Sequence, residues 1–339
     1  MSRALLSCAG GGLGDALVAS VVARALHQRY DTVDALALPS QAELLARVPD
    51  VDGIVVDDGT AESELVRTIV ERNYDACVVT WATAHNARVP AAARIPVRVG
   101  QARRLYSFRF TKRVVVRSEN GDVTSHWSDI LLDYARAIGC DAADRRYRFV
   151  PTPDDEREAL GALDAIGVPR DARGEFLIVN PCNAISSQRP VWPLDGWAAL
   201  IDGLRRRYRL PIAITGSRSD APLTESLAGR AGRDGSPVVS LAGTLGIGAF
   251  GALARRARAF AGITTGSMHV AAAVDCPTVG IFPFQTDFPD RWAPLAPETA
   301  IVRPSYPCHR GDTKERCRDY ACVANLDVAR ILAATQTIA

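Results

Sequence analysis

Residues Gly262–Asp290 read GITTGSMHVAAAVDCPTVGIFPFQTDFPD, and this stretch decides the fold. An apolar run, Ala259–Ile263, ends at a Thr-Thr-Gly-Ser turn, and a small-residue segment, Met268–Val274, follows it. A second apolar run begins after Pro277, at Thr278–Phe282. The order predicts a strand, a turn, a helix and a second strand, the unit from which parallel α/β sheets are built.

The Thr-Thr-Gly-Ser turn lies where the predicted helix begins. Backbone N–H groups without helical partners and the positive end of the helix dipole point there, which favours a phosphate group. Alanines 271–273 allow the helix to pack closely on the sheet. An ordinary crossover in an α/β core accounts for the stretch equally well.

A second glycine-rich turn follows the first apolar run of the chain, Ala4–Ala9. Gly10, Gly12 and Gly14 form G-x-G-x-G, which is not the dinucleotide fingerprint G-x-G-x-x-G. Asp15 at the start of the next helix would repel a pyrophosphate. A carboxylate above a glycine turn is suited to accept a proton from a hydroxyl. The alternative is that Asp15 only caps the helix.

Strand-like and helix-like segments alternate along the rest of the chain. This alternation predicts parallel, doubly wound sheets. Prolines and glycines gather in 147–175, where we expect a domain boundary. After the strand Phe176–Asn180, a loop rich in Asn, Ser and Arg leads to Trp192-Pro193. Such a loop, at the end of a strand, is where an open α/β sheet binds its ligand.

Composition excludes several classes of protein. The chain has 339 residues, 47% of them hydrophobic and 23% charged, with a net charge of +2. Two domains are expected for this length, and near-neutrality argues against nucleic acid as a partner. No apolar run is long enough to span a membrane, and the N-terminus does not resemble a signal peptide. Scattered cysteines in apolar runs indicate reduced thiols and a cytoplasmic protein.

Basic and aromatic residues are interleaved in Val97–Arg117. Arg103 and Arg104 lie within this segment, and Tyr106, Phe108 and Phe110 follow them. A cationic surface of this kind is suited to a phosphorylated or carboxylated acceptor. Solvated strand edges are the simpler explanation.

These motifs together resemble glycosyltransferase family 9, the heptosyltransferases of lipopolysaccharide synthesis. The family's C-terminal signature is matched by Thr265-Gly266, His269, Ala271-Ala272, Pro277-Thr278-Val279, Ile281-Phe282 and Thr286-Asp287. Gly-x-Gly-Asp at Gly12–Asp15 resembles its N-terminal signature. Two departures stand out. Thr264 replaces the family's usual Asp, and Arg189 is the nearest cation where a Lys is usual.

The resemblance implies the GT-B fold of class α/β, with two Rossmann-like domains and a cleft between them. It implies an acceptor-binding domain at 1–150, an interdomain linker region at 151–175, a nucleotide-sugar-binding domain at 176–325 and a C-terminal helix at 326–339.

The resemblance also implies an inverting, metal-independent transfer of a heptose or related sugar from an ADP-sugar to a sugar hydroxyl of lipopolysaccharide core. Asp15 would be the general base. The implied donor-binding residues are Ser186, Ser187, Arg189, Gly216, Asp220, Thr264, Thr265, Gly266, Ser267, Met268 and His269. The implied acceptor-binding residues are Gly12, Leu13, Gly14, Arg103 and Arg104.

Two alternatives stay open at this point. One keeps the chemistry but transfers the sugar to a protein such as an autotransporter. The other is a weakly active nucleotide-binding relative, because both departures fall at the donor site. Contact with the inner-membrane surface is expected to be peripheral at most.

Three cysteines near the end of the chain form a cluster in sequence. Cys308, Cys317 and Cys322 are spaced C-x₈-C-x₄-C, and His309 follows the first of them. Three Cys and one His are a ligand set for zinc or iron, so a structural metal site is one interpretation. Against it, the spacing lacks a C-x-x-C pair, and thiols without metal are the alternative.

Overall fold

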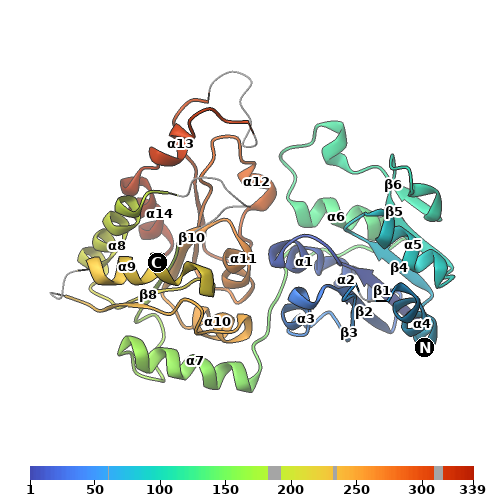
Figure 1. The fold of residues 1–339 in the computed structure, drawn as a ribbon, viewed down its shortest axis with the longest axis horizontal. Helices are drawn as coiled ribbons and strands as arrows, with labels where there is room; N and C mark the ends of the chain where they lie inside the picture. Colours follow the sequence, from blue (N-terminus) through green and yellow to red (C-terminus); the bar gives the residue numbers. More distant parts are fainter. Residues whose placement is uncertain (60, 182–191, 232–234, 309–315) are drawn as a thin grey trace. The chain divides into compact units, whose positions relative to one another are not determined.

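The structure is a computed structural model that describes residues 1–59, 61–181, 192–231, 235–308 and 316–339. It divides into two compact units, Met1–Val150 and Pro151–Ala339. Each unit is an α/β domain with its own sheet (Figure 1).

The first unit contains a six-stranded parallel sheet of order β3-β2-β1-β4-β5-β6. Its strands are β1 (Arg3–Ser7), β2 (Thr32–Ala37), β3 (Gly53–Val56), β4 (Ala76–Val79), β5 (Val97–Gln101) and β6 (Lys112–Val114). Its α-helices are α1 (Leu13–Ala19), α2 (Val21–Leu26), α3 (Pro39–Leu45), α4 (Glu62–Arg72), α5 (Ala84–Ala92) and α6 (Trp127–Arg136). Two short 3₁₀ turns, Ser107–Arg109 and Arg117–Asn120, flank β6.

Helices cover both faces of this sheet in two groups that pack among themselves. One group consists of α1, α2, α3 and α6, and the other of α4 and α5. Strand side chains alternate between faces. Leu5 and Leu36 therefore belong to the core beneath α4, which contributes Leu65 and Ile69. Burial on both faces explains why β1 and β4 read as continuous apolar runs.

The second unit repeats the plan with the order β12-β11-β10-β7-β8-β9, again all parallel. Its strands are β7 (Leu177–Asn180), β8 (Ile212–Ile214), β9 (Val238–Ser240), β10 (Ala259–Ile263), β11 (Thr278–Ile281) and β12 (Thr299–Val302). Its α-helices are α7 (Pro153–Ile166), α8 (Leu194–Tyr208), α9 (Ala221–Arg230), α10 (Ile247–Ala254), α11 (Gly266–Ala273), α12 (Pro289–Trp292), α13 (Ala321–Ala324) and α14 (Val328–Ile338).

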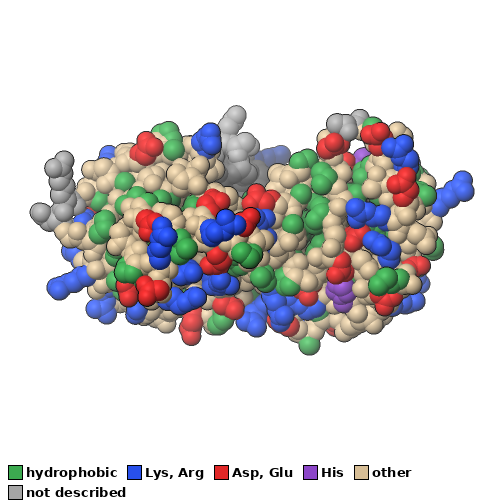
Figure 2. Space-filling model, turned by 90° about the horizontal axis from the view of Figure 1, so that it is seen from below, with side chains coloured by type: hydrophobic (Ala, Val, Ile, Leu, Met, Phe, Trp, Pro, Cys, Tyr) green, Lys and Arg blue, Asp and Glu red, His purple; other side chains and the backbone are tan. Residues whose placement is uncertain are grey.

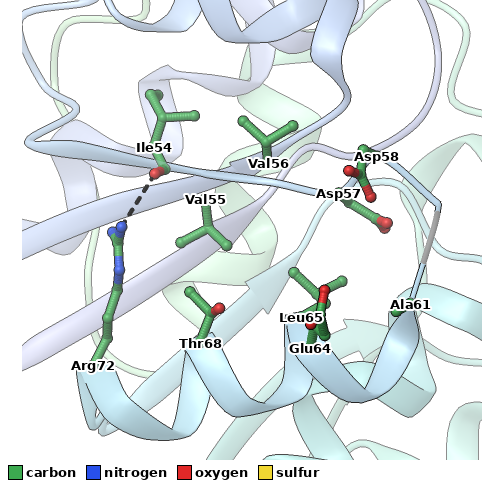
Figure 3. A pocket seen from close by; sticks show the side chains of 10 residues that line it. All are labelled: Ile54, Val55, Val56, Asp57, Asp58, Ala61, Glu64, Leu65, Thr68 and Arg72. Atoms are coloured by element: carbon green, nitrogen blue, oxygen red, sulfur yellow. Dashed lines mark hydrogen bonds between the residues drawn. The ribbon is translucent and has the colours of Figure 1, made fainter.

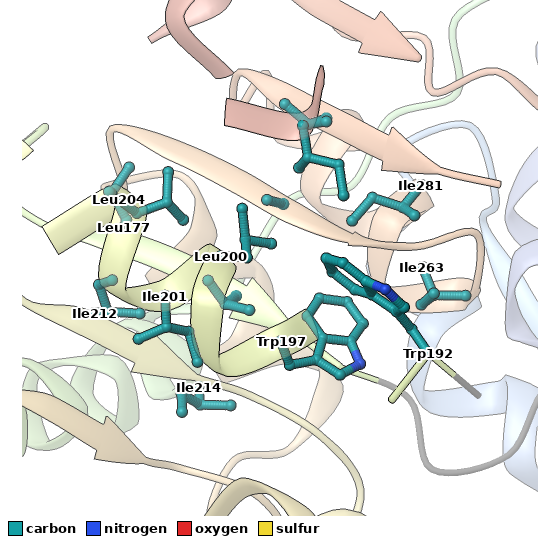
Figure 4. Packing of buried hydrophobic residues seen from close by; sticks show 14 of the residues in the cluster. Leu177, Trp192, Trp197, Leu200, Ile201, Leu204, Ile212, Ile214, Ile263 and Ile281 are labelled. Atoms are coloured by element: carbon teal, nitrogen blue, oxygen red, sulfur yellow. The ribbon is translucent and has the colours of Figure 1, made fainter. Parts of the chain in front are cut away.

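Two tryptophans begin the main core of the second unit (Figure 4). Trp192 and Trp197 meet edge to face, with ring centroids 4.8 Å apart. Trp197 lies in α8, whose Leu200 and Ile201 continue the same buried stripe against the strands. An edge-to-face pair adds about 0.5–1.5 kcal/mol to the free energy gained by burying both rings.

Both sheets have the doubly wound order. In each, the first three strands are added in one direction across the sheet, and the next three are added on the other side of the first strand. The reversal falls between β1 and β4 in the first unit and between β7 and β10 in the second. The parallel, doubly wound sheets expected from the alternation are therefore confirmed. Ligands of such sheets bind outside the carboxyl ends of the strands at this switch point.

Residues 151–175, expected to form an interdomain linker region, lie within the second unit. Their helix, α7, packs against α10. Thr152 caps it by accepting a hydrogen bond from the Asp155 N–H, and Gly167 ends it in the left-handed conformation. Strong caps and a packed apolar face make this segment a structural part of its domain.

None of the helices in the described ranges is long and apolar enough to cross a bilayer. On the face drawn in Figure 2, Lys and Arg side chains are interspersed with Asp and Glu. This mixture agrees with the small net charge of +2.

Candidate functional site

The glycine turn after β1 lies at the switch point of the first sheet and leads into α1. Gly12 is the N-cap of α1, and its backbone N–H donates a 2.7 Å hydrogen bond to Oδ2 of Asp15. Leu13 and Gly14 are the first two residues of the helix. Gly12, Leu13, Gly14 and Asp15 therefore lie on one turn, and their roles in acceptor binding and catalysis stay predictions.

Trp81, which follows β4, packs directly on this turn. A Cβ atom at Gly10 would lie 2.0 Å from Cδ1 of Trp81. A Cβ atom at Gly11 would lie 2.8 Å from Oδ2 of Asp15 and 2.9 Å from the Trp81 ring. Both glycines also have positive φ, +139° and +65°. The glycines are therefore required so that the indole and the carboxylate can approach the backbone.

Burial raises the pKa of Asp15 above its ordinary value of 3.8, although the Gly12 N–H opposes the shift. A carboxylate with a raised pKa holds a proton more strongly than one in water. Asp15 is thus better suited to general-base work than an exposed Asp.

Two buried amides that sequence reasoning left out hold the turn from behind. Gln41 of α3 donates a 2.6 Å hydrogen bond to the carbonyl of Gly10. Asn86 of α5 donates to the carbonyls of Ala9 and Trp81, at 2.5 and 2.7 Å. In the sequence, Gln41 and Asn86 are recognisable only as polar residues shortly after a strand. Many other residues of the chain fit that description.

A cluster of charged groups lies where β3 ends and α4 begins, at the carboxyl edge of the first sheet. His85 has one ring nitrogen 2.7 Å from Oδ2 of Asp57 and the other 3.1 Å from Oε2 of Glu62. Arg88 pairs with the same glutamate. Asp57 also lines a pocket of about 240 Å³ between β3 and α4, which Arg72 closes at its far end by bonding to the carbonyl of Ile54 (Figure 3). None of the sequence-predicted site residues lines this pocket.

The two arginines expected to bind the acceptor follow β5. Arg104 forms an ion pair with Glu119, with N and O 2.7 Å apart, so part of its charge is already balanced. Arg103 donates to the side-chain oxygen of Asn120 and has a positive φ of 60°. Their role in acceptor binding stays a prediction.

In the second unit the turn Thr264–Ser267 follows β10 at the switch point. Thr265 is the N-cap of α11, and among the described residues no side chain caps this helix. The helix spans Gly266–Ala273, two residues earlier than the sequence indicated at its start. Its first N–H groups therefore point at the carboxyl edge of the sheet, where an anion would be bound.

A hydrogen-bonded network connects this turn with the ends of β7, the neighbouring strand, and of β8, the strand beyond it. Asn180, at the end of β7, donates to the Thr215 carbonyl and hydroxyl at 3.0 and 2.9 Å. Its own oxygen accepts a 2.9 Å hydrogen bond from the Ser267 hydroxyl. Thr265 and Ser267 hydroxyls are also 2.9 Å apart. Asn180 and Thr215 were not singled out from the sequence.

Four other predicted donor residues, Gly216, Asp220, Met268 and His269, lie among the described residues of the second unit. The carboxylate of Asp220 accepts from the N–H and hydroxyl of Ser217, at 2.8 and 2.5 Å, and so holds the turn that contains Gly216. The side chain of Met268 is fully buried, and its role in donor binding stays a prediction. His269 is buried as well, with its ring edge to face with Trp292.

Ser186, Ser187 and Arg189 lie outside the described residues, so their predicted contacts to the donor diphosphate stay predictions.

The metal site expected from Cys308, Cys317 and Cys322 stays a prediction, because His309 and the rest of 309–315 lie outside the described residues. Among the described residues, no group of three or more His, Cys, Asp and Glu side chains could hold a metal ion. Cys322 is buried in a small apolar cluster with Phe284 and Val323. Sγ of Cys317 accepts a hydrogen bond from the Tyr320 N–H, while Cys308 is exposed.

The family model of glycosyltransferase family 9 (heptosyltransferase) matches residues 63–320. The chain belongs to this family. It is therefore a glycosyltransferase, and the resemblance found in the sequence is confirmed. The matched residues begin after Asp15, so a catalytic role of Asp15 rests on its geometry and not on the family model.

Relatives agree with this assignment. Lipopolysaccharide heptosyltransferase 3 of Escherichia coli (strain K12) is 24% identical over 300 residues, 79% of each chain. A family 9 glycosyltransferase from Veillonella parvula DSM 2008 superposes with a TM-score of 0.83 at 15% identity, covering 99% of this chain and 97% of its own. The ADP-heptose lps heptosyltransferase II of E. coli gives 0.78 at 18% identity, covering 100% and 98%. The expected GT-B fold is thereby confirmed.

Proposed function

We propose that this family 9 glycosyltransferase transfers a heptose, or a related sugar, from an ADP-sugar to a sugar hydroxyl of lipopolysaccharide core, with inversion. The observation that carries the proposal is the half-buried carboxylate of Asp15, held on a glycine turn at the switch point of the first sheet, with its pKa raised by partial burial. The names of the relatives supply the sugar, the nucleotide and the acceptor class.

Asp15 would act as the general base. Its Oδ2 is engaged by the Gly12 N–H, and Oδ1 would take the proton of the acceptor hydroxyl. The acceptor oxygen then forms a bond to the anomeric carbon while the bond from that carbon to the diphosphate breaks. A single displacement of this kind inverts the anomeric configuration, because attack and departure occur on opposite faces.

The leaving nucleoside diphosphate would be stabilised at the start of α11. Its first N–H groups, which no side chain among the described residues caps, and the helix dipole supply positive potential that needs no rearrangement during the reaction. Asn180 orients the Ser267 hydroxyl at this place. Ser186, Ser187 and Arg189 would add two hydroxyls and a bidentate cation.

The proposal also covers the residues that bind the acceptor and the cellular compartment of the reaction. Gly12, Leu13, Gly14, Arg103 and Arg104 would face the acceptor, and Thr264 would contact the donor sugar. Buried thiols at Cys8, Cys77 and Cys276, none of them in a disulfide, fit a reducing compartment, so we place the reaction in the cytoplasm.

A transfer assay with a panel of nucleotide sugars tests the proposal. We expect ADP-heptose, with a truncated lipopolysaccharide core as acceptor, to release ADP only when the acceptor is present. NMR of the product should show the opposite anomeric configuration to the donor. Release from a UDP-sugar instead, or transfer to a protein acceptor alone, would overturn the assignment of donor or acceptor. Nucleotide binding without turnover would indicate an inactive relative.

A further inference from the structure

Two large apolar side chains are displayed to solvent between β5 and β6. Leu105 is 98% exposed and Phe108 65%, and among the large apolar residues described only Met1 is more exposed than Leu105. They lie three positions apart on the segment that carries Arg103 and Arg104. Single exposed apolar residues are common, but two neighbouring ones so fully exposed indicate a binding surface.

Hydrogen bonds hold this segment in place. The Ser107 hydroxyl donates a 2.7 Å bond to the carbonyl of Gln101 and accepts a 3.0 Å bond from the Arg104 N–H. The Tyr106 hydroxyl donates to the Ala82 carbonyl at 2.6 Å, beside Trp81. The two apolar side chains are therefore presented outward by an anchored loop, on the sheet edge that carries Asp15.

Cations surround these apolar residues. The guanidinium of Arg109 lies 4.4 Å from the ring centroid of Phe108. Lys112 and Arg113 of β6 are both exposed. Within the described ranges Arg103, Arg109, Lys112 and Arg113 form no ion pair with a carboxylate, whereas Arg104 pairs with Glu119. The surface thus keeps unbalanced positive charge around an apolar centre.

We propose that this surface, residues 103–113, docks on a bilayer that contains anionic phospholipid. Leu105 and Phe108 would enter the boundary between headgroups and acyl chains, while the cations contact headgroup phosphates. Long basic side chains can lie along the interface with their charged ends at the phosphates. Docking here would bring the sheet edge with Asp15 to a lipid-anchored acceptor.

Vesicle sedimentation of the full chain tests the proposal and needs no transferase activity, so its outcome is independent of the proposed function. We expect binding to vesicles of phosphatidylethanolamine and phosphatidylglycerol and at least about tenfold weaker binding to pure phosphatidylcholine. Leu105→Ser/Phe108→Ser should weaken anionic-vesicle binding by about tenfold or more. Val70→Ser, at a 53% exposed position of α4, is the matched control and should bind like wild type.

Charge is tested separately with Lys112→Glu/Arg113→Glu, which should reduce binding and its sensitivity to salt. Thermal unfolding of each variant shows whether it is folded, and Leu105→Ser alone keeps the test valid if the double variant unfolds. Failure of the wild type to bind anionic vesicles would overturn the proposal. So would equal binding to both vesicle types, or by wild type and Leu105→Ser/Phe108→Ser. Capture of an acidic protein by a surface that ignores vesicles would assign it to a protein partner.

Discussion

Asp15 has one observed role and one proposed role, and a single substitution can separate them. Its carboxylate closes the turn by accepting from the Gly12 N–H, and it would also remove the acceptor proton. An amide can accept the first hydrogen bond through its oxygen but is no base. Replacing Asp15 with an amide is therefore the most direct test of the proposed chemistry.

Asp15→Asn should lower turnover by about 10²–10⁴-fold while the affinity for ADP stays unchanged. The matched control is Asp155→Asn in α7, whose carboxylate accepts from the Thr152 N–H at the same distance of 2.7 Å. We expect the control to lose up to about 1 kcal/mol of stability and no activity. Steady-state kinetics and calorimetry measure both. If Asp15→Asn keeps more than about a tenth of wild-type turnover, Asp15 is only a helix cap.

The raised pKa of Asp15 predicts an acidic limb in the pH profile of turnover. A base acts only when ionised, so the rate should fall with decreasing pH around a midpoint above 3.8. A raised pKa also means that the fold favours the protonated form. Its stabilising effect is full below the unfolded pKa and is lost as pH rises through the folded pKa. Asp15→Asn should consequently unfold no earlier than wild type at pH 7, and thermal unfolding checks this.

At the scale of elements, the N-terminus of α11 is the feature to test. Ser267→Asp places a carboxylate in its first turn, where it should stabilise the helix by about 0.3–1 kcal/mol but repel a diphosphate. We expect ADP binding to weaken by at least about tenfold, while Tm stays close to that of Ser267→Ala, which also lacks the donor to Asn180. Ser267→Ala, which removes the bond to Asn180 without adding charge, is the control and should bind ADP better than Ser267→Asp. Equal ADP affinity in wild type and Ser267→Asp, measured by calorimetry, would place the diphosphate elsewhere.

A buried carboxylate connects β1, β2 and α4. Asp34 accepts hydrogen bonds from Tyr74 Oη at 2.5 Å, Arg72 Nη1 at 2.9 Å and Arg3 Nη2 at 3.0 Å. Burial alone would raise the pKa of Asp34, but these three donors outweigh it and lower the pKa. The stabilisation is therefore present above the unfolded pKa and is lost as pH falls through the folded pKa.

Asp34→Asn should destabilise the protein by about 2–3 kcal/mol at pH 7. Breaking a fully buried pair costs about 3–5 kcal/mol, and the partial exposure of both arginines reduces this. Tyr74→Phe, which removes one donor, should cost about 1 kcal/mol. Urea unfolding measures both. The difference in the free energy of unfolding between wild type and Asp34→Asn should become smaller at low pH. If this free-energy difference does not change with pH, ionisation of Asp34 is not its cause.

At the scale of the whole molecule, the two units have separate sheets and separate apolar cores. The proposed base lies in the first unit and the proposed diphosphate site in the second. Residues 151–339 expressed alone should therefore fold and bind ADP within about threefold of the full chain, since no interaction of α11 or Asn180 described here comes from the first unit. Residues 1–150 should not bind ADP. Isothermal titration of both fragments checks this, and strong ADP binding by the first fragment would reverse the assignment.

Much of the fold follows from local patterns in the sequence. Apolar runs of strand length, glycine turns and helical spacing depend on neighbours within a few residues, so they predict both sheets and the turns at Asp15 and Thr265. The start of α11 was misplaced by two residues because Gly266 and Ser267 read as turn residues, although helices accept such residues in their first turn. The family signature likewise consists of short contiguous motifs.

By itself, then, the sequence determined the α/β class, the family and the turns that carry Asp15 and Thr265–Ser267. Tertiary structure alone decided which distant residues meet there. Asn180 reaches Ser267 across 87 positions because β7 lies beside β10, and Trp81 reaches Gly10 because β4 lies beside β1. It also decided that Cys322 packs in an apolar cluster and that Leu105 faces solvent. The physical reason is that periodicity and turn chemistry are local, whereas strand order and side-chain burial depend on the packing of the complete chain.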